Sequence, residues 1–164
     1  MQTVRDWNPT DGVACQGDIV FIAIPSDVAV SVLDEIKPIS GRLIIQEGEV
    51  SGHHHAIDLL ERHRLDTATP RKTSRSVEQL LSAAQAGKIE LPQARLYRDP
   101  RAVEALRRCG ILTRTDLAVG CLVVTCGPMV VVHEEHDGIR LPVGRYYVGH
   151  QVESAGAEER VVSD

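Results

Sequence analysis

Five of the seven histidines of this chain lie in two short segments. Three are consecutive, at 53–55, and two stand at the ends of the sequence His-Glu-Glu-His, at 133–136. Each segment adjoins an apolar, β-branched run of the kind that forms strands. Imidazoles bind metals and change charge near neutral pH. The two segments therefore predict a small chemical site built between two strands.

Side chains alternate between faces along a strand, so His53 and His55 are expected on one side and the histidine between them on the other. In the second segment an extended chain would place Glu135 on the same side as His133. A turn near Glu135 would bring His136 inward instead, and both arrangements stay open at this point. The predicted metal ligands are His53, His55, His133 and His136.

Several imidazoles beside a carboxylate suit Zn²⁺, and also Fe²⁺ or Mn²⁺ where coordination positions stay open. We expect a divalent metal ion, with zinc ahead of iron or manganese. Such an ion would lower the pKa of bound water toward about 7 and supply a nucleophile. The expected proton carriers, and so the predicted catalytic residues, are Glu49, Glu134 and Glu135. The leading prediction is a metal-binding, barrel-like β protein, acting as a metal-dependent hydrolase or another small metalloenzyme.

Two other functions remain open beside the metalloenzyme, so the sequence does not decide whether the protein is an enzyme. One is a metal-independent acid/base hydrolase, for example of a phosphodiester, with His53 or His55 and His133 or His136 as proton carriers. Activity that survives a chelator would favour it. The other is a non-enzymatic β module with a structural or partner-binding role, for which metal-dependent folding without turnover would be the sign.

Composition limits the class of protein. The 164 residues, 43% of them hydrophobic, are enough for one domain with its own core. A formal charge of −5 and 3% aromatic residues argue against bulk nucleic-acid binding. No apolar run approaches the roughly 20 residues of a membrane helix, and no basic and apolar leader opens the chain. We expect a cytoplasmic protein without membrane contact; a small-molecule or polymer substrate and a homo-oligomer are both left open.

The hydrophobic pattern predicts a mainly β fold of the α+β class, a small barrel or sandwich with two or three inserted helices. Expected strands cover 18–24, 42–46, 94–97, 117–125, 129–133 and 145–152. Expected helices cover 77–86 and 100–109, with 26–36 either helix or loop. The predicted layout is an N-terminal segment 1–16, a β-rich domain 17–153 with a helical insertion at about 56–116, and a flexible acidic tail 154–164.

The histidine segments also carry a resemblance. Residues 48–55, Gly-Glu-Val-Ser-Gly-His-His-His, and residues 132–153, which begin Val-His-Glu-Glu-His, resemble a group of small uncharacterised bacterial and phage-associated proteins. The match covers 17–24, 42–55 and 130–152. It supports the site and implies no particular reaction.

A superficial similarity to cupins rests on the His-x-His strand followed by a later histidine, which in cupins gather a metal inside a β barrel. The glutamate that cupins place a few residues after His-x-His has no clear counterpart, since Glu61 lies six residues after His55 in a segment that reads as helix. The sequence therefore predicts an analogous site and not a cupin.

Overall fold

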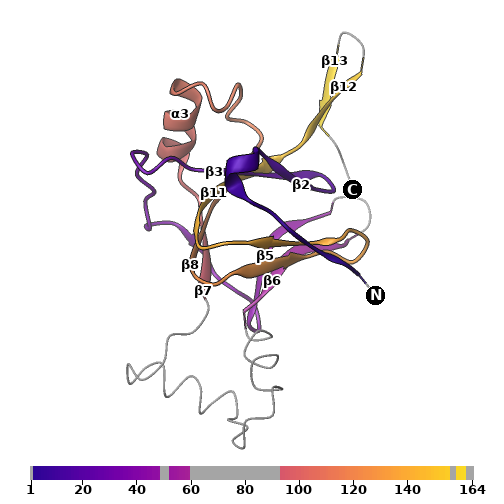
Figure 1. Cartoon of the computed structure of the whole chain (residues 1–164). Helices are drawn as coiled ribbons and strands as arrows, with labels where there is room; N and C mark the ends of the chain where they lie inside the picture. The colour runs from indigo at the N-terminus through magenta and orange to yellow at the C-terminus, as the bar shows by residue number, and fades with distance from the viewer. Residues whose placement is uncertain (1, 49–51, 60–92, 156–157, 162–164) are drawn as a thin grey trace, which may run out of the picture.

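Two open β-sheets packed on one another form the body of the protein (Figure 1). The computed structural model describes residues 2–48, 52–59, 93–155 and 158–161. The five-stranded sheet runs in the order β1 (Val4–Asp6), β10 (Gly138–Leu141), β9 (Met129–Val132), β6 (His54–Asp58) and β5 (Arg42–Glu47). The six-stranded sheet runs β2 (Ala14–Gln16), β3 (Ile19–Ala23), β11 (Gly144–His150), β8 (Ala118–Cys126), β7 (Gln93–Tyr97) and β4 (Glu35–Ile36).

The core lies between the two sheets and follows the alternation of side chains along each strand. In β3 the residues Ile19 and Phe21 are fully buried, and in β5 the same holds for Leu43 and nearly so for Ile45. All four belong to one apolar cluster that draws on both sheets. The mainly β prediction is confirmed. The barrel is wrong for the described residues, because neither sheet closes on itself.

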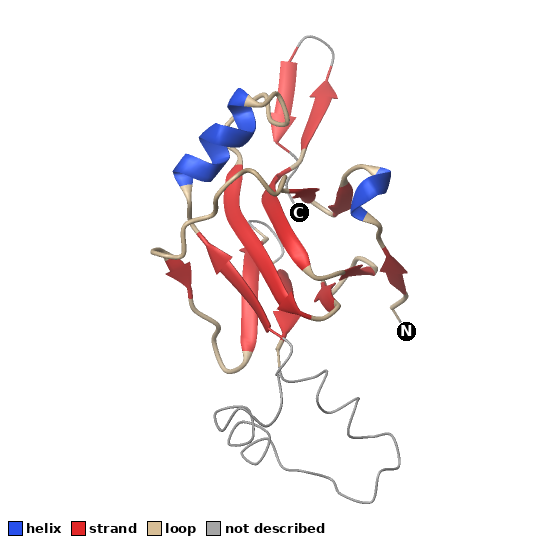
Figure 2. Cartoon of the chain, turned by 60° about the vertical axis from the view of Figure 1, so that its left-hand side comes forward, coloured by secondary structure: helices blue, strands red, loops and turns tan. Residues whose placement is uncertain are grey.

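Helix α3 (Pro100–Arg108) lies on the face of the six-stranded sheet that is turned away from the other sheet (Figure 2). Asp99 caps it, its Oδ1 accepting from two backbone N–H groups of the first turn at 3.1 and 3.2 Å, and a proline occupies the first helical position. Leu106 belongs to one buried apolar cluster with Cys121 and Tyr147 of the sheet. This is the helix expected at 100–109. No helix among the described residues is long and apolar enough to cross a membrane.

The segment 26–36 is a loop that ends in β4, so the helical alternative is wrong there. Side chains from elsewhere in the fold satisfy its backbone: the Arg145 guanidinium donates to the carbonyl oxygens of Pro25 and Val28, and Asp99 Oδ2 accepts from the N–H of Ser31. These partners replace the bonds that a helix would have made within itself.

Three predicted boundaries also differ from the structure. The range 56–116, expected as a helical insertion, contributes strand β7 to the six-stranded sheet, and the helix expected at 77–86 lies outside the described residues. The segment 1–16 supplies β1, a short 3₁₀ helix η1 (Pro9–Asp11) and β2. Where a flexible tail was expected, β12 (Val152–Ala155) and β13 (Glu158–Val161) pair as a ribbon that projects from the body (Figure 1).

Replacing the helix cap tests how α3 is held. We expect Asp99→Ala to lower the free energy of unfolding by about 1–2 kcal/mol, because it removes the cap and the contact to Ser31. Urea unfolding followed by circular dichroism measures this. The matched control is Asp116→Ala, which removes only an exposed ion pair to Arg114 and should cost clearly less than Asp99→Ala. Equal costs in the two variants would contradict the prediction.

Candidate functional site

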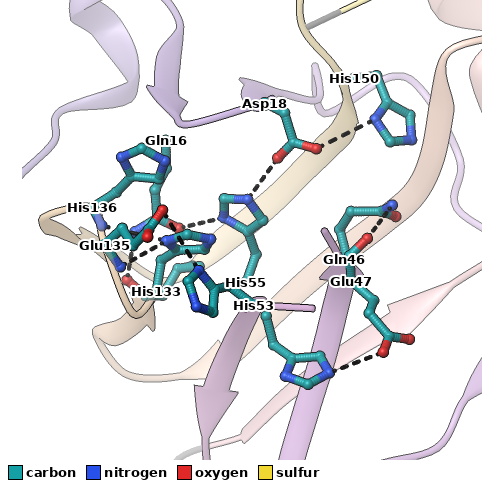
Figure 3. A network of polar contacts seen from close by, with 12 residues as sticks. Gln16, Asp18, Gln46, Glu47, His53, His55, His133, Glu135, His136 and His150 are labelled. Atoms are coloured by element: carbon teal, nitrogen blue, oxygen red, sulfur yellow. Dashed lines mark hydrogen bonds and ion pairs between the residues drawn. The ribbon is translucent and has the colours of Figure 1, made fainter. Parts of the chain in front are cut away.

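Pairing of β6 with β9 brings the two histidine segments together (Figure 3). The antiparallel register sets Ala56 opposite Val132, and its extension by one residue sets His55 opposite His133. These two rings lie 4.3 Å apart between centroids, inclined by 34°. The contact between segments nearly 80 residues apart in the chain is thus a consequence of strand register.

The alternation expected for the first segment is present. His53 and His55 both adjoin His133, with ring centroids 5.8 and 4.3 Å from it. His54 points away, toward the carboxylates of Glu47 and Glu134.

The second segment turns after β9. The turn brings both Glu135 and His136, the two alternatives left open by the sequence, to the site. The His136 ring stacks on His133 with centroids 4.5 Å apart and planes 25° apart. Glu135 Oε2 lies 3.5 Å from Nδ1 of His53, with the glutamate side chain 58% exposed. The histidine cluster, as we call it from here, consists of His53, His55, His133 and His136.

His133 is buried and serves as a hydrogen-bond acceptor. Its Nδ1 accepts from the backbone N–H groups of Glu135 and His136, at 3.1 and 3.3 Å. That nitrogen therefore carries no proton, and we assign a neutral ring with its proton on Nε2. A metal bound through Nε2 would instead require a proton on Nδ1, facing two N–H donors. In this conformation His133 fits a neutral, hydrogen-bonded ring better than a metal ligand.

The N-terminal segment fixes the turn 133–137 from outside. Gln2 Nε2 donates to the carbonyl oxygen of His133 at 2.7 Å and also to the next carbonyl oxygen. Thr3 Oγ1 donates to Asp137 Oδ1 at 2.6 Å, and its own carbonyl accepts from the residue that opens β10. The carbonyl groups at the start of this turn are not paired within the β-sheet, so a side chain supplies their hydrogen-bond donors.

The histidine cluster shares His55 with a buried line of three polar side chains, Gln16, His55 and Asp18. Their exposed fractions are 3%, 0% and 2%. Gln16 Nε2 donates to the carbonyl oxygens of Val131 and Asp137 at 3.1 and 2.8 Å. Because carbonyl oxygens only accept, the amide nitrogen must face them and Oε1 must face His55 Nδ1, 2.9 Å away. His55 therefore donates from Nδ1.

The other ring nitrogen of His55 shares one proton with Asp18. Nε2 and Asp18 Oδ1 are 2.7 Å apart. With Nδ1 already protonated, the pair is either imidazolium with carboxylate or imidazole with carboxylic acid, and it is neutral overall in both forms. Neutrality matters because an uncompensated charge at this depth is costly. On its other side, Asp18 Oδ2 lies 4.0 Å from Nδ1 of His150, which is 23% exposed.

The remaining predicted acids differ in their surroundings. Glu134 Oε2 accepts from the backbone N–H of His54 at 2.8 Å. Desolvation raises the pKa of Glu134, but the hydrogen bonds from backbone N–H groups and the nearby Arg42 guanidinium outweigh it, so the pKa lies below its usual value. Glu49 falls outside the described residues.

The predicted metal ligands therefore meet, but they are not arranged around one point. Within the part of the chain that the structure describes, no three His, Cys, Asp or Glu side chains are grouped so that they could hold a metal ion. Both ring nitrogens of His55 face Gln16 and Asp18. Metal binding stays a prediction.

Sequence reasoning missed Gln16 and Asp18. The two residues flank Gly17 in the tight turn between β2 and β3, and no local pattern in the sequence marks them as part of a site. Comparison of the chain with protein-family models, curated proteins and solved structures gave no match.

Removal of Asp18 tests the buried pair. We expect Asp18→Ala to lower the free energy of unfolding by about 3 kcal/mol, because His55 Nε2 loses the buried carboxylate with which it shares a proton. Urea unfolding gives the value, and the double variant with His55→Leu gives the coupling between the two. Additive effects of the two substitutions would contradict a buried pair.

The lowered pKa of Glu134 predicts a pH dependence. A group whose folded pKa is depressed stabilises the protein above its ordinary pKa, and that contribution is lost as the pH falls through the folded value. The destabilisation caused by Glu134→Gln, measured by thermal unfolding, should therefore shrink between pH 7 and pH 3. The more exposed neighbour, Glu135→Gln, is the matched control and should change less. A pH-independent cost for Glu134→Gln would count against this prediction.

Proposed function

We propose that the histidine cluster is a metal-independent acid/base site in which His53 and His136 carry the protons. The observation that carries the proposal is their placement: they are the two partly exposed rings of the cluster, on either side of buried His133. A general acid or base must reach the atom that it protonates or deprotonates. The sequence left four histidines as possible proton carriers, and the partial exposure of these two favours them over the two buried ones.

The buried rings support this division of roles. His133 accepts two backbone hydrogen bonds, and His55 is engaged at both nitrogens, so neither is placed to exchange protons with a substrate. Two positive charges 4.5 Å apart, the spacing of the His133 and His136 rings, would repel by about 4 kcal/mol at an effective dielectric constant of 20. Because His133 is neutral, His136 can carry a positive charge without this repulsion.

Glu135 supports His53 as the base. Its carboxylate lies 3.5 Å from Nδ1 of His53, close enough to stabilise the charged form of the imidazole. We assign His53 as the group that takes a proton from water and His136 as the group that gives one to the leaving group. The reaction class is hydrolysis of an ester or amide.

The surroundings favour a substrate that carries no negative charge. Glu47, Glu134, Glu135 and Asp137 are all exposed in or beside the two histidine segments. Carboxylates of one sign repel a polyanion and raise the local concentration of cations. We therefore place a neutral or cationic ester or amide ahead of a phosphodiester.

Turnover of model substrates tests the proposal. With excess chelator present, p-nitrophenyl esters and aminoacyl arylamides should be hydrolysed, and His53→Ala and His136→Ala should each lose about 10²–10⁴-fold in kcat. His54→Ala is the matched control, since this adjacent ring points away from the cluster toward Glu47 and Glu134, and it should keep its activity. Full activity in His53→Ala, or no turnover of any neutral or cationic member, would refute the assignment.

A second candidate function, binding of a divalent metal, is favoured by one distance. The 3.5 Å between His53 Nδ1 and Glu135 Oε2 is long for a hydrogen bond, but it is close to the separation of about 3.3 Å between two ligand atoms on a tetrahedral zinc ion. His53, Glu135 and a rotated His136 would then supply the ligands, with zinc ahead of iron or manganese. Such an ion would supply a Lewis acid and an activated water.

Elemental analysis of the tag-free protein distinguishes the two candidates. The acid/base proposal expects no stoichiometric metal in the wild type. The metal candidate expects about one ion per chain, lost in His53→Ala and kept in His54→Ala. Metal content that is equal in both variants would place any bound ion away from the histidine cluster.

A further inference from the structure

We infer that Gln16 is a positioning residue: its amide decides which nitrogen of His55 carries a proton and holds the turn that bears His133 and His136. The inference rests on the proposed function only for its effect on turnover. The assignment of the proton rests on geometry alone.

The amide of Gln16 joins three segments that are distant in the chain. Gln16 belongs to β2 of the six-stranded sheet, whereas His55 belongs to β6 and the carbonyl groups of Val131 and Asp137 to β9 and the turn after it, all in or beside the five-stranded sheet. One buried side chain thus ties the two sheets together at the histidine cluster. The two carbonyl groups bracket the turn on both sides, so the amide fixes where the turn begins and ends.

The surroundings of Gln16 require a particular donor or acceptor at each atom of its amide group. The site needs one acceptor for His55 Nδ1–H and two donors for the carbonyl oxygens, at the end of a chain with the length of glutamine. A glutamate keeps an acceptor but has no N–H donors, and a methionine keeps the length but offers neither. The two substitutions therefore separate the two roles.

Without the acceptor, His55 should change its tautomer. With no acceptor left for Nδ1–H, His55 releases that proton and keeps the proton on Nε2, which it donates to Asp18 Oδ1. The pair then carries one negative charge, on a carboxylate whose other oxygen lies 4.0 Å from Nδ1 of His150. Nδ1 then carries no proton. In the wild type, by contrast, Nδ1 is protonated in both forms of the pair, because Gln16 Oε1 can only accept.

Nitrogen-15 NMR of the histidine rings tests this without a substrate. In the wild type and in Gln16→Glu we expect His55 Nδ1 to be protonated. In Gln16→Met we expect the Nδ1–H signal to be lost and the proton to appear on Nε2. The matched control is Gln46→Met on β5, whose amide donates to the carbonyl oxygen of Glu47 and not to the histidine cluster. It should leave the His55 signals unchanged.

Hydrogen exchange reports the second role. Amide exchange in 133–137 should become about tenfold faster in both Gln16→Glu and Gln16→Met, since both lose the donors to Val131 and Asp137, and should not change in Gln46→Met. An unprotonated Nδ1 in the wild type, a protonated Nδ1 in folded Gln16→Met, or unchanged exchange in both Gln16 variants would overturn the inference. If the tautomer changes as expected but no variant hydrolyses the model esters, the positioning role stands and the acid/base proposal fails.

Discussion

The contact between Gln16, His55 and Asp18 is the constraint on which the site depends. These three polar side chains lie in a core that is mostly apolar, and each costs free energy unless its hydrogen bonds are made. The amide makes three, and the His55–Asp18 pair shares one proton, so the line is satisfied and neutral. A buried network of this kind works in one register only, because a shift of β6 by one residue would turn His55 out of the core.

Strand register then sets the rest of the cluster. Once His55 faces inward, the alternation of β6 places His53 beside it near the surface and turns His54 toward Glu134. The backbone N–H of His54 donates to that glutamate, which follows His133 directly. The same pair of segments is thus held on one face by imidazole contacts and on the other by a charge-assisted hydrogen bond.

The sequence allowed the strands and the pairing of His53 with His55 to be predicted, because apolar alternation and side-chain alternation are local properties. It did not allow the loop 26–36 to be distinguished from a helix, since the carbonyl oxygens of Val28 and of Pro25 just before the loop accept from Arg145, more than 100 residues away. Gln16 and Asp18 were missed for the same physical reason. Their role is set by a partner on the opposite sheet, which no local pattern shows.

The chemistry of an imidazole depends on what its second nitrogen contacts. The spacing of histidines in a sequence therefore does not by itself determine their function. The spacing of the four histidines suits metal ligands and proton carriers equally, since both functions need imidazole rings brought together. The contacts differ: a ligand ring normally donates from its far nitrogen, whereas His133 accepts there from two backbone N–H groups. Those donors come from Glu135 and His136 themselves, so the turn that brings these residues to the cluster also fixes His133 as a neutral ring. The same backbone thus sets both the membership of the cluster and the protonation of its central member.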